Sequence, residues 1–234
     1  MPKLLLIETS TSLCSTALVE GERISCSRKS TGMREHASKT AVFVKEMLDE
    51  RALKVSDCDA VCVSSGPGSY TGLRVGSSSA KGLCFGAGIP LIGIGTLDIL
   101  ANQAISEALL PEDCRTIVPM IDARRMEVYS AVYSLADSRQ PVRTTEIVPT
   151  VVNSNSFSDL LETGPVLFIG DGAAKCADVI SSANATFVQV CPDATAMLEP
   201  ALRAWNEKRF ENTAYFEPFY LKEFVATVSH KNLF

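Results

Sequence analysis

A turn rich in glycine and proline constrains the fold of this chain more than any other feature. The turn reads Ser-Gly-Pro-Gly-Ser-Tyr-Thr-Gly-Leu-Arg over residues 65–74 and follows the apolar run 60–64. A hydroxyl side chain can cap the helix that follows, and backbone N–H groups converge at such a helix start. This segment predicts a strand, a tight turn and a helix. Turns of this kind bind phosphate or hold the helix against a neighbouring segment.

The turn lacks the patterns of two common nucleotide-binding loops. No lysine follows a glycine anywhere in the chain, so the P-loop pattern G-x-x-x-x-G-K-[ST] is absent. The glycines of the turn follow the spacing G-x-G-x-x-x-G, which is one residue longer than the dinucleotide-binding fingerprint. The sequence therefore argues against a P-loop enzyme and against a nicotinamide or flavin enzyme.

Composition excludes several further classes of protein. With 234 residues, 46% of them hydrophobic, the chain can form one large domain or two small ones. The net charge of -5 argues against binding nucleic acid through a basic face, and no apolar run reaches the roughly 18 residues of a membrane span. The eight cysteines form no C-x-x-C pair, and His36 and His230 are far apart in sequence. We therefore expect no metal site, no signal peptide and a cytoplasmic location.

The order of predicted elements is repeated along the chain. In the first half we expect strands over 4–9, 14–19, 24–29, 59–65 and 90–94, with helices over 35–53, 72–86 and 96–106. In the second half we expect strands over 116–122, 127–134, 146–152, 165–169 and 187–191, with helices over 157–161, 173–182 and 195–209. This repeat predicts an α/β protein with a duplicated ribonuclease-H-like fold, in which two lobes have mixed sheets. We expect the lobes to comprise residues 1–106 and 107–216, with the tail 217–234 joining the first lobe.

The helix over 35–53 has a wider apolar face than one sheet requires. At about 100° per residue, its apolar side chains cover an arc of about 180°, whereas covering a sheet needs roughly 100°. They are Ala37, Ala41, Phe43, Val44, Met47 and Leu48. The next helix has small residues at spacings of four, although each interior glycine costs about 1 kcal/mol of helix propensity. These are Gly72, Gly76 and Ala80, and also Ser78, Gly82 and Gly86. Both patterns are explained either by contact between these two helices or by a surface for a partner.

The chain resembles the TsaB (YeaZ) family, which takes part in bacterial synthesis of tRNA threonylcarbamoyladenosine. The resemblance covers nearly the whole chain and is carried by residues 6–11, 66–76, 122–129, 169–173 and 217–221. The long turn and the Asp-Ala-Arg hairpin at 122–124 are specific to the family in combination. The first and fourth segments are shared loosely with sugar kinases, actin and Hsp70-type ATPases.

This resemblance implies a fold, a role and partners. The fold is that of the two-lobed actin-like ATPases (ASKHA), with a degraded nucleotide cleft. The role is that of a non-catalytic scaffold that activates TsaD, the subunit holding the catalytic metal through a His-x-x-x-His motif absent here. The P-loop ATPase TsaE joins the pair, tRNA is met only through the complex, and the isolated chain forms a homodimer. No cofactor is expected to bind tightly to this chain, while ATP or ADP could sit at the interface of the complex.

The resemblance also implies two sets of site residues. The partner-binding residues lie on the helices 35–53 and 72–86, and they are His36, Ala37, Thr40, Ala41, Val44, Met47, Leu48, Leu73, Gly76 and Ala80. The degraded nucleotide site comprises Glu8, Thr9, Ser10, Asp122, Gly170, Asp171 and Gly172. Read from the residues alone, these are equally a polar strand end, a charged hairpin, and a strand-to-helix turn in which Asp171 caps the helix.

No catalytic residue is expected in this chain. Kinases of the superfamily carry aspartate at the position of Glu8, and the extra methylene displaces the carboxylate by about 1 Å, which spoils in-line phosphoryl transfer. The rival hypothesis is an independent actin-like kinase or ATPase of small molecules that uses a cleft between Glu8 and Asp122. A metal protease is a third and weaker alternative. Calorimetry with Mg-ATP separates the scaffold from the kinase.

Overall fold

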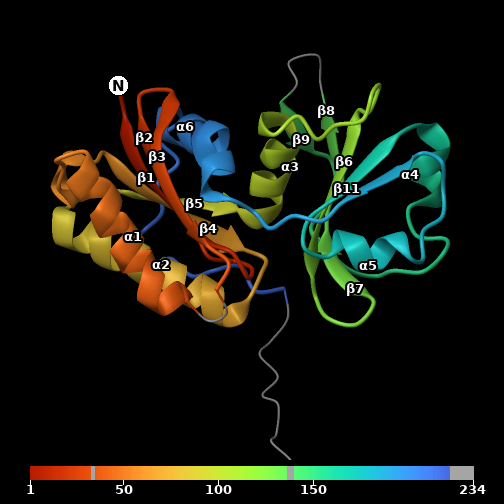
Figure 1. Cartoon of the computed structure of the whole chain (residues 1–234), viewed down its shortest axis with the longest axis horizontal. Coiled ribbons are helices and arrows are strands. Elements are labelled where there is room, and N and C mark those ends of the chain that lie inside the picture. Colours follow the sequence, from red (N-terminus) through yellow and green to blue (C-terminus); the bar gives the residue numbers. More distant parts are fainter. Residues whose placement is uncertain (33–34, 136–139, 222–234) are drawn as a thin grey trace, which may run out of the picture.

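The chain folds into two lobes that lie side by side, each built around a mixed β-sheet (Figure 1). The structure is a computed structural model that describes residues 1–32, 35–135 and 140–221. Within these ranges no helix combines the length and the apolar character needed to cross a membrane.

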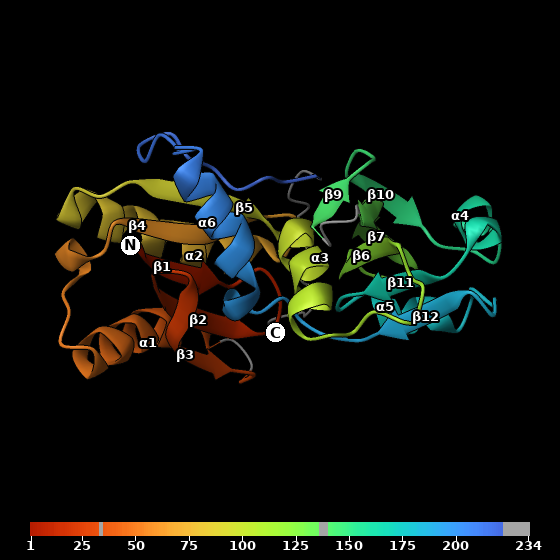
Figure 2. The same cartoon turned by 90° about the horizontal axis from the view of Figure 1, so that it is seen from above.

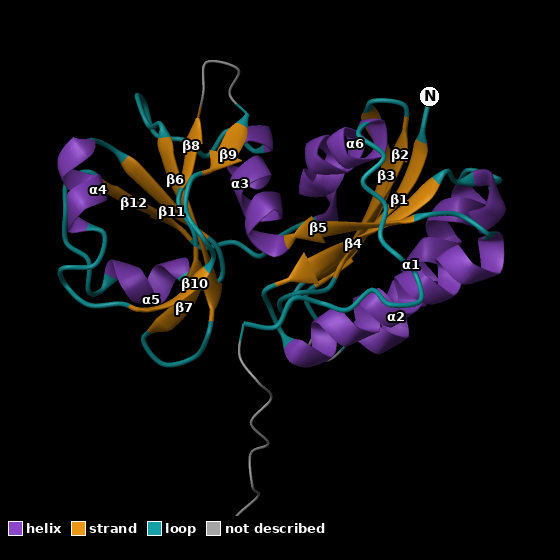
Figure 3. Ribbon diagram, turned by 180° about the vertical axis from the view of Figure 1, so that it is seen from behind, coloured by secondary structure: helices purple, strands orange, loops and turns teal. Residues whose placement is uncertain are grey.

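The first lobe has a five-stranded sheet in the order β3-β2-β1-β4-β5, with β2 antiparallel to both of its neighbours. Its strands are β1 (Lys3–Glu8), β2 (Cys14–Glu20), β3 (Arg23–Ser30), β4 (Ala60–Gly66) and β5 (Leu91–Gly95). Its helices are α1 (His36–Glu50), η1 (Val55–Asp57), α2 (Tyr70–Ala87) and α3 (Thr96–Ser106). Helices α1 and α2 lie together on one face of the sheet (Figure 3).

The second lobe repeats this order as β10-β7-β6-β11-β12. Its strands are β6 (Thr116–Asp122), β7 (Glu127–Ser130), β8 (Tyr133–Leu135), β9 (Pro141–Arg143), β10 (Val148–Val151), β11 (Val166–Ile169) and β12 (Ala185–Val188). The helical segments in the second half of the sequence are α4 (Ser158–Thr163), α5 (Ala173–Ala177), η2 (Ala194–Met197) and α6 (Leu198–Asn206). The repeated strand order confirms the predicted duplication of a ribonuclease-H-like unit.

Several elements of the second half of the sequence differ from the predictions. The strand expected over 187–191 lies two residues earlier at its start, as β12 (Ala185–Val188). The strand expected over 127–134 is broken after Ser130, because β7 pairs with the end of β6 whereas β8 pairs with its start. The helix expected over 173–182 ends at Ala177, where the N–H groups of Val179 and Ile180 both turn back to Cys176 O. The helix expected over 195–209 is a 3-10 turn followed by α6, with Pro200 in the first turn of α6, where proline is tolerated.

Each lobe receives a helix from the other half of the sequence. Residues 194–206 were expected in the second lobe, but η2 and α6 pack on the first sheet (Figure 2). Their side chains Ala194, Ala196, Met197, Ala201 and Ala204 cover a cluster that includes Leu4, Leu6, Ile92 and Ile94. Helix α3 follows the first sheet in sequence, yet its Leu97, Leu100, Ala101 and Ala104 pack with β6 and β11 of the second. The two helices therefore tie the lobes together.

The segment after α6 runs back over the first lobe. Phe216 is buried in the core beneath α1 and α2, and Lys81 Nζ on α2 donates to Phe216 O at 3.0 Å. Phe219 N donates to the carbonyl of Ser65 at 2.7 Å, and the Tyr220 ring lies 5.0 Å from that of Tyr70. The part of the tail over 217–221 thus lies against the first lobe. The rest of the predicted tail, residues 222–234, falls outside the described residues.

Candidate functional site

The glycine-proline turn packs directly on the loop after β1. Ser69 N donates to Ser10 O at 2.6 Å, and Thr9 Oγ1 donates to Gly72 O at 2.8 Å. A Cβ atom at Gly68 would lie 2.4 Å from Ser10 O, and one at Gly72 would lie 2.1 Å from Thr9 O. The glycines therefore permit backbone contact between the turn and the loop. Here the turn holds its helix against a neighbouring segment of the same chain.

Glu8 ends β1 as a fully buried carboxyl group. One of its oxygens accepts the Ser10 N–H, whereas Oε2 has no hydrogen-bond partner in the described structure, nor do the buried hydroxyls of Ser10 and Thr11. Burial raises the pKa of Glu8 to about 7, and the hydrogen bond from the Ser10 backbone offsets only part of that rise. A carboxyl group that is half protonated at neutral pH is a poor fixed ligand for magnesium. The unpaired oxygens fit water or a small polar group.

In the second lobe, Asp122 is neutralised by a lysine. Lys175 Nζ forms an ion pair with Asp122 and donates to Arg125 O at 2.8 Å and Glu127 O at 2.6 Å. Asp122 N donates in turn to Asp171 Oδ1 at 2.9 Å. Burial raises the pKa of Asp171 to about 6, although this hydrogen bond lowers it in part. The hairpin after β6 is thereby closed on α5, and the carboxylate of Asp122 is not free for a metal-bound phosphate.

Gly170 and Gly172, the two glycines of the predicted nucleotide turn, allow neighbouring segments of the second lobe to pack closely. Gly170 has φ +137°, and a Cβ there would lie 2.1 Å from Met120 O. A Cβ at Gly172 would lie 2.9 Å from Val128 Cγ1. Asp171 Oδ1 accepts the Asp122 N–H and does not cap α5, so the predicted cap at Asp171 is wrong. In the first turn of α5, Ala174 N donates instead to Gln189 Oε1 at 2.8 Å. Where the chain is described, no three His, Cys, Asp or Glu side chains lie close enough to hold a metal ion.

The structure thus gathers the predicted nucleotide residues into two separate groups. Glu8, Thr9 and Ser10 lie on the first lobe, while Asp122 and residues 170–172 lie on the second. No described hydrogen bond links the groups. The group on the first lobe contains a buried, protonatable carboxyl, and the group on the second lobe contains a carboxylate paired with lysine.

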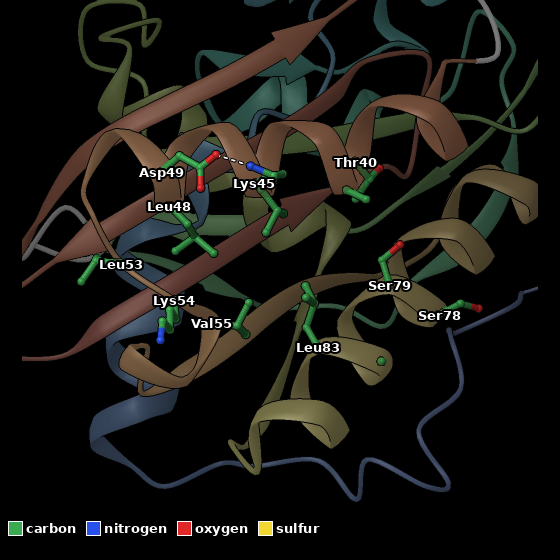
Figure 4. Close-up of a pocket in the computed structure, with 13 residues that line it drawn as sticks. Thr40, Lys45, Leu48, Asp49, Leu53, Lys54, Val55, Ser78, Ser79 and Leu83 are labelled. Atoms are coloured by element: carbon green, nitrogen blue, oxygen red, sulfur yellow. Dashed lines mark hydrogen bonds and ion pairs between the residues drawn. The ribbon is translucent and has the colours of Figure 1, made fainter.

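A groove of about 500 Å³ opens between α1 and α2 (Figure 4). We call it the α1–α2 groove, and its lining residues are Thr40, Ala41, Val44, Lys45, Leu48, Asp49, Leu53, Lys54, Val55, Ser78, Ser79, Gly82 and Leu83. Its floor is aliphatic, and the Lys45–Asp49 ion pair lies along one rim. An open groove with an apolar floor and a charged rim is typical of a surface that receives another helix.

The structure separates the predicted partner-binding residues into three sets. Ala37 and Ala41 are exposed, and His36 is half-buried with Nε2 2.8 Å from Thr11 O. Thr40, Val44 and Leu48 line the groove but are each at most 5% exposed. The third set is buried against the chain's own sheet and loops, and it comprises Met47, Leu73, Gly76 and Ala80.

For that third set the prediction of partner contact is corrected. The stripe of Gly72, Gly76 and Ala80 faces inward, because a Cβ at Gly76 would lie 2.3 Å from Thr9 Oγ1. The small residues let α2 approach the loop after β1, not a helix of another molecule. The second stripe differs, since a Cβ at Gly82 or Gly86 would meet nothing within 4 Å.

Sequence reasoning missed Phe85, which is 88% exposed on the outer side of α2. Helical spacing contains the signal: Leu73, Ala80 and Cys84 form the buried line of α2, and the residue after Cys84 is rotated by about 100° away from it. Phe85 therefore projects from the same open side of α2 as Gly82 and Gly86. Val42 on α1 is also largely exposed.

The fold and the groove define a two-lobed α/β protein of the actin-like (ASKHA) fold class whose first lobe carries an open apolar groove. Residues 27–228 match the family model described as TsaD, tRNA N6-adenosine threonylcarbamoyltransferase. The chain is 31% identical to the tRNA threonylcarbamoyladenosine biosynthesis protein TsaB of Haemophilus influenzae, over 95% of this chain and 94% of that protein. The Escherichia coli TsaB is 28% identical over 96% of each.

A solved structure agrees with these relatives. YeaZ from Pseudomonas aeruginosa superposes with a TM-score of 0.83 at 26% identity, covering 94% of this chain and 100% of that one. The chain belongs to the TsaB (YeaZ) family of tRNA threonylcarbamoyladenosine biosynthesis proteins.

Proposed function

We propose that this chain is a non-catalytic scaffold that binds the catalytic subunit TsaD through the α1–α2 groove. Through that pair it meets TsaE and tRNA in the cytoplasm, and it activates the transfer of a threonylcarbamoyl group to an adenosine of tRNA. The observation that carries the proposal is the groove itself, an apolar surface left open on a member of the TsaB family.

The groove has the composition of an interface core. Val44, Leu48 and Leu83 give it an aliphatic floor, and Gly82 leaves room for a helix backbone to approach closely. Phe85 adds an exposed ring next to this surface, and burial of such a ring is worth about 2 to 3 kcal/mol. Apolar side chains surrounded by charged ones mark protein–protein surfaces. In the absence of TsaD, a second copy of the chain occupies the groove and forms a homodimer.

In this proposal any nucleotide chemistry takes place in the complex with TsaD and not in this chain alone. Lys175 neutralises Asp122, and Glu8 is a buried, protonatable group, so this chain lacks the pair of free carboxylates that a magnesium-dependent phosphoryl transfer requires. We propose that ATP or ADP, if the complex holds either, is bound at the subunit interface with ligands from TsaD.

The test places a charge in the groove without disturbing the core. Val44 and Leu48 are unsuitable for this purpose because they are buried, whereas Ala41 is exposed and a Cβ atom at Gly82 would meet nothing within 4 Å. We expect the double variant Ala41→Asp/Gly82→Asp to weaken binding to TsaD by at least about 100-fold, because a buried unpaired carboxylate costs several kcal/mol. Calorimetry or co-purification with TsaD measures the effect.

The matched control is Ala177→Asp, an exposed alanine on α5 of the second lobe, which should bind TsaD as the wild type does. Thermal unfolding of each variant verifies that the fold is retained. Unchanged affinity of the folded double variant would remove the groove from the interface. Loss of affinity in the control as well would show that added charge, and not its position, is responsible.

A further inference from the structure

A second, polar pocket of about 140 Å³ lies where the two lobes meet. Strand β5 contributes Gly95, helix α3 contributes Asp98 and Asn102, α6 contributes Arg203, and β9 of the second lobe contributes Pro141. None of its lining residues belongs to the α1–α2 groove or to the loops after β1 and β6. The family relationship and the proposed scaffold role assign nothing to this pocket.

Arg203 is the unusual member of the pocket. Its Nε–H is buried and has no hydrogen-bond partner, and no ion pair of Arg203 occurs within the described ranges. Arg209 also lines the pocket but is paired with Glu207 at 2.6 Å. Leaving a buried charged donor unsatisfied costs about 1 to 3 kcal/mol or more. A guanidinium in this position therefore has unused capacity for an acceptor inside the pocket.

Asp98 and the start of α3 complete the polar lining. Asp98 Oδ1 accepts the buried Tyr133 hydroxyl at 2.7 Å, which leaves its second oxygen available. Asp98 and Arg203 line one small pocket without forming an ion pair, so a group between them can contact both. Asp98 lies in the first turn of α3, and its Oδ2 atom lies against Gly95, the residue before the helix.

We propose that this pocket binds a small oxyanion that carries a proton, of the size of hydrogen phosphate. The Arg203 guanidinium donates hydrogen bonds to two oxygens of the anion, because the planar guanidinium matches the spacing of two oxygens on a phosphate. The protonated oxygen donates to the free oxygen of Asp98, because a carboxylate can only accept. A fully deprotonated anion such as sulfate would face the charge of Asp98 without a hydrogen bond. The pocket should therefore select hydrogen phosphate over sulfate.

Thermal unfolding of the full chain at constant ionic strength tests the site. Inorganic phosphate should raise Tm by roughly 3 to 5 °C at ten times its Kd and continue to raise it with the logarithm of its concentration. The Kd for sulfate should be at least about tenfold higher. Arg203→Gln should abolish the phosphate effect, and Arg203→Lys should retain a weaker one. Arg115→Gln removes an exposed arginine that does not line the pocket and should behave as the wild type.

The variant Asp98→Asn tests the role of Asp98 directly. Its amide oxygen still accepts the hydrogen bond of the Tyr133 hydroxyl, and its NH2 group donates to an unprotonated oxygen of the bound anion. This variant should bind sulfate at least as tightly as phosphate. Equal phosphate effects in the wild type and Arg203→Gln would overturn the site, as would the lack of any phosphate effect on the wild type at constant ionic strength. Phosphate selectivity that persists in Asp98→Asn would overturn the assigned role of Asp98.

Discussion

Glu8 is a fully buried carboxyl group whose second oxygen has no hydrogen-bond partner in the described structure. Its position at the end of β1 is the one where the superfamily's kinases carry aspartate, yet the pocket around it disfavours a charge. Removal from water dominates the shift that brings the pKa of Glu8 to about 7, and the nearby charge of Asp193 acts in the same direction. The residue is therefore charged at neutral pH only at the expense of stability.

This shift predicts a pH dependence of folding. The folded protein holds the Glu8 proton up to about pH 7, whereas the unfolded chain releases it near pH 4.5. Stability from this group is fully present below pH 4.5 and is lost as the pH rises to about 7, by up to about 3 kcal/mol. Glu8→Gln should lack this decline. Urea unfolding at pH 5 and pH 8 measures it.

The comparison with the variant isolates Glu8 from other groups. Asp171, whose pKa is raised to about 6, contributes in the same direction, but equally in both proteins. The difference in unfolding free energy between wild type and Glu8→Gln should therefore change with pH by about 2 to 3 kcal/mol. A difference that is constant between pH 5 and pH 8 would show that Glu8 is ionised in the folded protein as in the unfolded chain.

At the scale of elements, α2 carries two rows of small residues with opposite surroundings. A Cβ at Gly76 would lie 2.3 Å from Thr9 Oγ1, whereas one at Gly82 would meet nothing within 4 Å. We expect Gly76→Ala to destabilise the protein by about 1 to 3 kcal/mol through overpacking. Gly82→Ala should stabilise it by up to about 1 kcal/mol through helix propensity. The two changes are chemically identical, so each controls the other in urea unfolding, and the same sign for both would contradict this assignment of faces.

The sequence predicts the existence of elements better than it predicts their surroundings. The bounds 96–106 of α3 and 116–122 of β6 are predicted to the residue, because each is a periodic or apolar run with clear ends. The short strands β8 and β9 lack such a signal, since three residues cannot show a period.

Candidate site residues show the same limit. Helical spacing correctly marks Met47 and Gly76 as members of an apolar or small face, but a period cannot say whether that face meets the chain's own sheet or another molecule. The pairing of Asp122 with Lys175 is likewise invisible in the sequence, because the two residues are brought together only when α5 closes on the hairpin.

At the scale of the whole molecule, the lobes are not independent in their cores. The first sheet is covered on one face by α1 and α2 from its own half and on the other by η2 and α6 from the end of the chain. The second sheet packs against α3, which belongs to the first half. Separation of the halves would therefore expose one apolar face of each sheet.

This exchange predicts that residues 1–106 cannot fold alone. Without α6, the side chains of Leu4, Leu6, Ile92 and Ile94 would be exposed to water on a single sheet face. Burial of each such side chain is worth about 1.5 to 3 kcal/mol, so exposing all four costs about 6 to 12 kcal/mol, as much as the 5 to 15 kcal/mol that stabilises a typical domain. The fragment 1–106 should show no cooperative thermal transition. The full chain should unfold in one transition, because α3 contributes Ile99 to the first core and Leu97 to the second and must leave both together. Scanning calorimetry of the full chain and of the fragment measures these transitions. Two resolved transitions in the full chain, or a cooperative transition in the fragment, would mean that each lobe is stable without the helix it receives.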